Sequence, residues 1–135
     1  MACFLVPAAE AAVVTIVEKA VSRREKEPET VEMELDGGIE EVEKIPFSRK
    51  LRWLSNLLWG GALLLMFEHL WHGEVVPWFP FLTAAADPAD AAVMLHEMAT
   101  VGVTMAVVVT AAWLCMIAAA SVIEKRAVKT VPAAE

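Results

Sequence analysis

The stretch MATVGVTMAVVVTAAWLCMIAAASVI, residues 98–123, decides the fold predicted for this chain. Its 26 residues include no charged side chain, and its polar members are chiefly Thr100, Thr104 and Thr110. An α-helix needs roughly 20 apolar residues to cross a hydrocarbon core about 30 Å thick. A soluble helix of this length would instead show a polar stripe toward water. The sequence therefore predicts a transmembrane helix over residues 98–123.

A second apolar run, residues 53–72, precedes this stretch and is separated from it by a loop. Together the two runs predict an all-α integral membrane protein built on a two-span transmembrane helical hairpin over residues 47–126. The composition agrees, because 58% of the 135 residues are hydrophobic, whereas soluble domains contain roughly 45–50% apolar residues.

The charged residues are segregated along the chain. All eleven Lys and Arg lie outside residues 53–124, while the loop between the runs has Glu74, Asp87 and Asp90 and no base. The positive-inside rule then predicts that the N-terminal linker and the C-terminus are cytoplasmic and that the loop lies outside. We expect a multi-pass protein of the cell membrane, with the lipid bilayer as a partner. Nucleic acid is disfavoured as a partner, because the bases do not form one basic face.

The N-terminal segment, residues 1–22, is predicted to form an amphipathic helix. At 100° per residue, Val13 and Val17 fall on one face and Glu18 and Lys19 on the other. Two arrangements stay open: a helix in the cytoplasmic interface or packed on a partner, or a third span with its N-terminus outside. Glu10 falls on the apolar face, which is costly in lipid but tolerable against a partner helix.

Two polar segments complete the predicted organisation. Residues 23–46 hold nine acids between Glu25 and Glu43, which predicts an acidic, solvated cytoplasmic linker. The Gly37-Gly38 pair allows a short β-hairpin there, although like charges along both arms weaken it. Residues 127–135 are expected to be a cytoplasmic tail.

Candidate functional residues gather where the apolar runs meet the loop. Glu68, His69 and His72 end the first run, and His96 and Glu97 precede the second. Ionisable side chains inside or beside a membrane span are functional candidates, because leaving them in lipid is costly. Iron, manganese and zinc sites in helical bundles take carboxylates and imidazoles from facing helices. The candidate metal ligands are therefore Glu68, His69, His72, His96 and Glu97.

A haem site is an alternative, because two histidines from neighbouring spans could supply axial ligands to haem b. The candidate haem ligands are His72 and His96. Counting about 1.5 Å per residue from the inner boundary puts His96 roughly 12 Å further out than His72. Straight helices would thus keep the two imidazoles apart, unless the second helix tilts, bends or extends further into the cytoplasm. A proton or substrate relay and a purely structural role also remain open.

Two weaker patterns concern packing and thiols. Small residues recur at four-residue spacing in both runs and permit close helix approach. The two cysteines lie far apart in sequence and indicate neither a disulfide framework nor zinc-ligand spacing. The residues in these patterns are Asn56, Gly60, Gly102, Ala106, Thr110, Cys3 and Cys115.

The sequence predicts a small accessory or binding subunit that holds a metal or haem at the outer ends of two transmembrane helices. A cofactor-free assembly or transporter subunit and a di-iron-type membrane metalloenzyme are the alternatives. No catalytic residue is assigned, because the chain has no nucleophile elbow, phosphate loop or Cys-x-x-Cys motif. A dimer of the hairpin would form a four-helix bundle, so a homo-oligomer or a larger membrane complex is expected.

Overall fold

The computed structural model describes residues 2–25, 30–35 and 38–129. For residues 30–35, 38–43 and 127–129 it describes the backbone alone. In chain order the elements are α1 (Leu5–Ser22), β1 (Thr30–Leu35), β2 (Gly38–Glu43), α2 (Phe47–Trp71), a 3₁₀ helix (Thr83–Ala86), α3 (Pro88–Glu97), a π-helical turn (Met98–Gly102) and α4 (Val103–Lys129).

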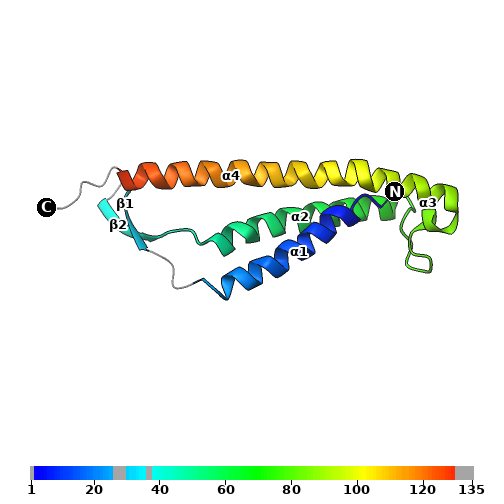
Figure 1. The fold of residues 1–135 in the computed structure, drawn as a ribbon, viewed down its shortest axis with the longest axis horizontal. Helices are drawn as coiled ribbons and strands as arrows, with labels where there is room; N and C mark the ends of the chain where they lie inside the picture. The colour runs from blue at the N-terminus through cyan, green and yellow to red at the C-terminus, as the bar shows by residue number, and fades with distance from the viewer. Residues whose placement is uncertain (1, 26–29, 36–37, 130–135) are drawn as a thin grey trace.

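Three long helices lie side by side (Figure 1). α1 and α4 run in the same direction, and α2 runs antiparallel to both. The N-terminus, the end of α2 and the loop before α3 therefore meet at one end, which we call the loop end. The hairpin of β1 and β2 and the last turns of α4 lie at the opposite end.

The helix predicted over residues 98–123 is confirmed and extends well beyond that range. α3, the π-helical turn and α4 form one continuous helix, and its span Pro88–Arg126 has a mean hydropathy of 2.4 over its most apolar window. Only 11% of that window is buried within the chain, so most of its apolar surface faces outward. Among the described residues, this is the one helix long and apolar enough to cross a membrane.

The start of this helix follows from local sequence. The carboxylate of Asp87 accepts hydrogen bonds from the backbone amides of Ala89 at 2.8 Å and Asp90 at 3.4 Å. Pro88 occupies the first helical turn, where its missing N–H costs nothing. The helix consequently begins at residue 88, ten residues before the apolar run.

α1 packs against α2 through residues spaced three or four apart, as expected for two closely packed helices. The core at this seam joins Ala11 to Leu54 and Leu58, and Trp113 of α4 closes it from the third side. The opposite faces of the three helices expose large apolar side chains. These include Ile16, Val17, Leu63, Leu64, Phe67, Val107, Val108 and Leu114.

The small residues of α4 provide a close approach to α1. Gly102 and Ala106 are buried, and a Cβ at position 102 would lie 2.9 Å from the carbonyl oxygen of Cys3. Gly60 of α2 has nothing within 4 Å of the equivalent position, and Asn56 is exposed. The close contact therefore uses the row on α4 and joins it to α1.

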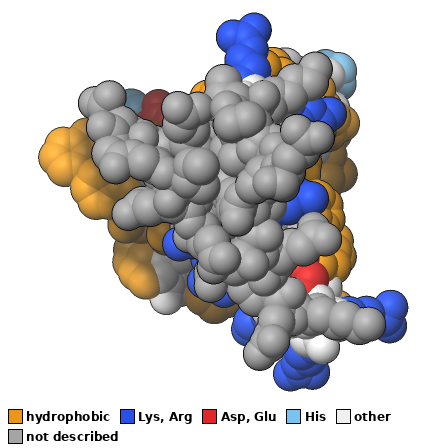
Figure 2. Space-filling model, turned by 90° about the vertical axis from the view of Figure 1, so that its left-hand side faces the viewer, with side chains coloured by type: hydrophobic (Ala, Val, Ile, Leu, Met, Phe, Trp, Pro, Cys, Tyr) orange, Lys and Arg blue, Asp and Glu red, His pale blue; other side chains and the backbone are white. Residues whose placement is uncertain are grey.

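The acidic segment, expected to be a solvated linker in which a short β-hairpin was possible, contains two paired strands, and the turn position Gly37 lies outside the described residues. β1 and β2 pair antiparallel, with a register from Thr30 opposite Glu43 to Leu35 opposite Gly38. This register puts Glu32 opposite Glu41. The two strands lie at the end of the molecule where the Lys and Arg side chains gather (Figures 1 and 2).

Candidate functional site

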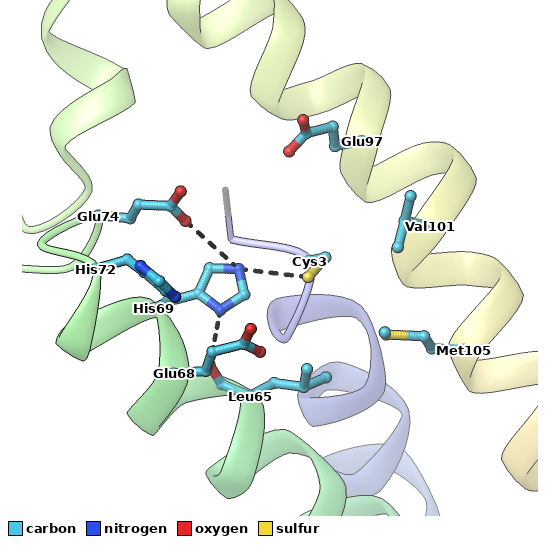
Figure 3. A pocket seen from close by; sticks show the side chains of 9 residues that line it. All are labelled: Cys3, Leu65, Glu68, His69, His72, Glu74, Glu97, Val101 and Met105. Carbon is cyan, nitrogen blue, oxygen red and sulfur yellow. Dashed lines mark hydrogen bonds and ion pairs between the residues drawn. The ribbon is translucent and has the colours of Figure 1, made fainter.

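A cavity of about 330 Å³ opens at the loop end, between α2, the continuous helix from α3 to α4 and the residues that precede α1. We call it the His69 cavity. Figure 3 shows its side chains converging from these three elements. Four of the five predicted ligands line it, together with two residues that sequence reasoning missed, Cys3 and Glu74. The lining residues are Cys3, Leu65, Glu68, His69, His72, Glu74, Glu97, Val101 and Met105.

His69 is the central residue of the cavity. It continues the buried row of α2 that contains Leu58 and Ala62, so the residue is only 6% exposed. Its Nδ1 lies 2.7 Å from the carbonyl oxygen of Leu65, an atom that can only accept, so Nδ1 carries a proton. Nε2 then faces the cavity. The ring of Phe4 packs edge-on against the imidazole at 5.4 Å.

Cys3 contacts His69 Nε2. Its Sγ lies 3.4 Å from His69 Nε2, and the contact is buried. The turn that carries Cys3 is held in place where its carbonyl packs against Gly102. Residues 3 and 69 come together only because α1 packs along α2, so no sequence spacing signals this pair.

The C-terminal cap of α2 places Glu74 next to His69. Gly73 has φ of 74°, and the amide of Glu74 donates to the carbonyl of His69 at 2.9 Å. With the bond from the Gly73 amide to Leu70, this is the Schellman ending that glycine favours. The Glu74 carboxylate lies 3.7 Å from His69 Nε2. Gly73 directly after a predicted helix was the sequence signal that could have found Glu74.

The other predicted ligands are distributed unevenly. Glu68 and His72 lie on the exposed rim of the cavity, and Glu97 is half-buried on the facing helix. His96 is exposed and does not line the cavity. α3 extends past the end of α2 (Figure 1), in the direction that the depth count predicted. His72 and His96 are consequently not brought to one site in this chain.

The side chains around His69 do not form a complete metal-coordination shell. Across residues 2–25, 30–35 and 38–129, no group of three His, Cys, Asp or Glu side chains is placed to hold a metal ion. Cys3 and Glu74 each approach His69 Nε2. Metal binding is therefore not supported by a preformed three-ligand group.

Polar contacts elsewhere tie the three helices together. Thr110 donates to the carboxylate of Glu10 at 2.6 Å, which joins α4 to α1. Thr15 and Ser55 share a hydrogen bond of 2.8 Å between α1 and α2. Nearer the opposite end, Arg52 contacts Glu18 at 3.0 Å. These bonds satisfy the polar groups that α1 carries on its packed face.

Comparisons with protein-family models, with curated proteins and with solved structures found no match. The class of the molecule thus rests on its own geometry: a predominantly helical protein with, in the part that the structure describes, one helix long and apolar enough to span a membrane, and with an acid- and histidine-lined cavity at its loop end.

Proposed function

We propose that this chain is a small multi-pass membrane protein that binds a metal ion in the His69 cavity, as an accessory or binding subunit of a membrane complex. In this proposal α2 and the long α4 helix are the two predicted spans and α1 is the third. The loop end faces the outside, and residues 23–46 and the C-terminus are cytoplasmic.

The arrangement of charge supports this topology. The ends of the helices opposite the cavity carry the bases, including Arg23, Arg49 and Arg126, and Figure 2 shows Lys and Arg side chains around this end. The positive-inside rule makes it the cytoplasmic end. Exposed apolar side chains on all three helices supply a surface suited to lipid. Glu10, costly on a lipid-facing helix, is bonded to Thr110 inside the bundle instead.

One observation carries the metal proposal: Glu68, His69, His72 and Glu97, chosen from sequence for their chemistry, line the same cavity with Cys3 and Glu74. Thiol, imidazole and carboxylate groups are the usual protein ligands of zinc and other transition metals. A cavity at the end of a helical bundle also gives an ion access from water without crossing the bilayer.

A cofactor-free assembly subunit is the second candidate. The observation that favours it is that no three ligands in the described part of the chain are preassembled for a metal. In that case the cluster of Glu and His side chains ends the spans and contacts a partner protein.

The test is the metal content of the full chain, purified in detergent and measured by elemental analysis before and after dialysis against Zn²⁺. We expect about one ion per chain in the wild type, loss in His69→Gln, and retention in His96→Ala, a matched histidine control outside the cavity. Thermal unfolding of each variant shows whether it is folded.

Three other results would overturn the metal proposal. A wild type that takes up no metal would favour the cofactor-free subunit. Metal that remains in folded His69→Gln would put the ion elsewhere. A Soret band that disappears in both His72→Ala and His96→Ala would indicate haem, with the two histidines brought together between copies of the chain.

A further inference from the structure

We infer that the His69 cavity takes a thiophilic metal ion, such as Zn²⁺ or Cd²⁺, with Cys3 Sγ and His69 Nε2 as its first two ligands. This inference rests on the proposed function and names the ion class and a ligand, Cys3, that the sequence did not reveal.

Cys3 Sγ and His69 Nε2 lie at a separation that suits two ligands of one zinc ion. Zinc lies about 2.3 Å from a thiolate sulfur and about 2.0–2.1 Å from an imidazole nitrogen, and a tetrahedral angle then separates the two ligand atoms by roughly 3.5 Å. Cys3 Sγ and His69 Nε2 are 3.4 Å apart. An ion could therefore replace the hydrogen bond between them with little movement of either side chain.

The imidazole of His69 is oriented in the way that is usual for a metal-binding histidine. Histidines that bind metals usually donate their other ring N–H to a carbonyl or a carboxylate, which fixes the ring and keeps the ligating nitrogen unprotonated. The bond from His69 Nδ1 to Leu65 is of this kind. It leaves Nε2 directed at Cys3, as Figure 3 shows. The edge-on ring of Phe4 restrains the imidazole from another side.

The remaining ligands come from the cavity wall. Glu74 Oε2 is 3.7 Å from Nε2, close to the roughly 3.3 Å expected for a carboxylate oxygen and a nitrogen on one tetrahedral zinc. The absence of a preassembled trio means that binding requires a side-chain rotation. Glu68 and His72 on the exposed rim can also rotate inward, since neither is fixed by packing. Cys3 and His69 thus form a buried pair with carboxylates around it.

The thiol decides the class of ion. Thiolate ligands select Zn²⁺, Cd²⁺ and Cu⁺ over Mg²⁺, Ca²⁺ and Mn²⁺, which prefer oxygen. On binding, the Cys3 S–H bond breaks, the sulfur forms its bond to the metal, and the proton leaves to solvent, so the metal keeps its oxidation state. One proton is released per ion bound.

The experiment uses Co²⁺ as a spectroscopic probe of the full chain in detergent under reducing conditions, followed by displacement with Zn²⁺. The wild type should show a thiolate-to-cobalt charge-transfer band in the near ultraviolet. Cys3→Ser, a nearly isosteric change, should lose the band and bind Zn²⁺ at least about tenfold more weakly, since a hydroxyl replaces a thiolate ligand. Cys115→Ser is the matched control, because Cys115 is an exposed free thiol on α4.

The outcomes separate this inference from the proposed function. If Zn²⁺ binds at one per chain through His69 but no thiolate band forms and Cys3→Ser keeps full affinity, the Cys3 assignment is wrong and the proposed function stands. If the wild type binds neither Co²⁺ nor Zn²⁺, both are wrong. Equal loss of the band in Cys115→Ser would also overturn the assignment.

Discussion

Gly102 is the residue at which the geometry of the cavity is set. It lies where the π-helical turn meets α4, and a Cβ added there would stand 2.9 Å from both the Cys3 carbonyl oxygen and Val6 Cγ2. The contact with the Cys3 carbonyl oxygen could be relieved only by a shift of the backbone, because that atom is not the end of a flexible side chain. The absent side chain at position 102 therefore allows the turn carrying Cys3 to lie over His69.

Gly102→Ala is accordingly expected to destabilise the protein by about 1–3 kcal/mol, the usual cost of overpacking. Gly60→Ala is the matched control, because nothing lies within 4 Å of its added Cβ. Alanine there should be neutral or stabilising by about 0.5–1 kcal/mol, as helix propensity predicts. Thermal unfolding in detergent measures both changes, and equal shifts of the same sign would contradict the close approach at Gly102.

Single residues differ in how far sequence could identify them. Glu68 and His69 stood out because ionisable groups at the end of an apolar run require an explanation, and both line the cavity. Cys3 could not be found, because its contact with residue 69 depends on the packing of α1 along α2. His96 was chosen by chemistry alone, and the length of α3 carries it away from the cavity.

At the scale of elements, local sequence signals predicted where the helices form but not which helices pack against one another. The apolar run predicted α4, and the cap by Asp87 with Pro88 in the first turn explains why the helix already begins at residue 88. The amphipathic pattern of residues 1–22 predicted α1, but two positions for it stayed open. Periodicity shows that a face is apolar and not which helix covers it. In the structure Val13 and Val17 of that face are exposed, whereas Glu18, expected on the polar face, is buried and contacts Arg52 of α2. α4 covers the part of the apolar face around Glu10, which bonds to Thr110.

The connection between α1 and α2 yields a pH-dependent prediction. Glu25 accepts from the backbone amide of Ser48 in the first turn of α2 at 3.0 Å. Hydrogen bonds from the Ser48 side chain and from nearby backbone amides lower the pKa of the Glu25 carboxyl below its ordinary value of 4.5. The ionised carboxylate thus satisfies an amide that the helix cannot bond itself.

Because the pKa of Glu25 is lower in the folded state, its ionised form stabilises the fold above pH 4.5, and this stabilisation is lost as the pH falls through the folded-state pKa. Glu25→Gln should lower the melting temperature at pH 7, and the difference from wild type should shrink in the acid range below pH 4.5. Melting curves of both proteins across this range measure the effect. A difference that stays constant with pH would show that the charge of Glu25 does not matter.

For the whole molecule, the decisive feature is that the His69 cavity and the Lys and Arg side chains lie at opposite ends. The cavity and the acidic residues Glu74 and Asp90 are at the loop end, whereas the bases flank the other ends of the helices. The sequence already showed this segregation for the hairpin. It could not show that Cys3 also lies at the loop end, because that depends on the direction in which α1 packs.

The proposed topology predicts which positions a membrane-impermeant maleimide reaches in intact cells. In a cysteine-free background, Phe79→Cys in the loop should be labelled at once, since Phe79 is 87% exposed. Arg24→Cys and Arg126→Cys, at the other ends of α1 and α4, should react only after the membrane is permeabilised. An epitope tag at the N-terminus should be accessible to antibody in intact cells, because three spans put the two termini on opposite sides. A hidden N-terminal tag with the same cysteine pattern would mean that α1 does not cross the membrane, and Cys3 could then not meet His69 at the outer surface. The experiment therefore tests the packing of α1 and the location of the proposed metal anchor together.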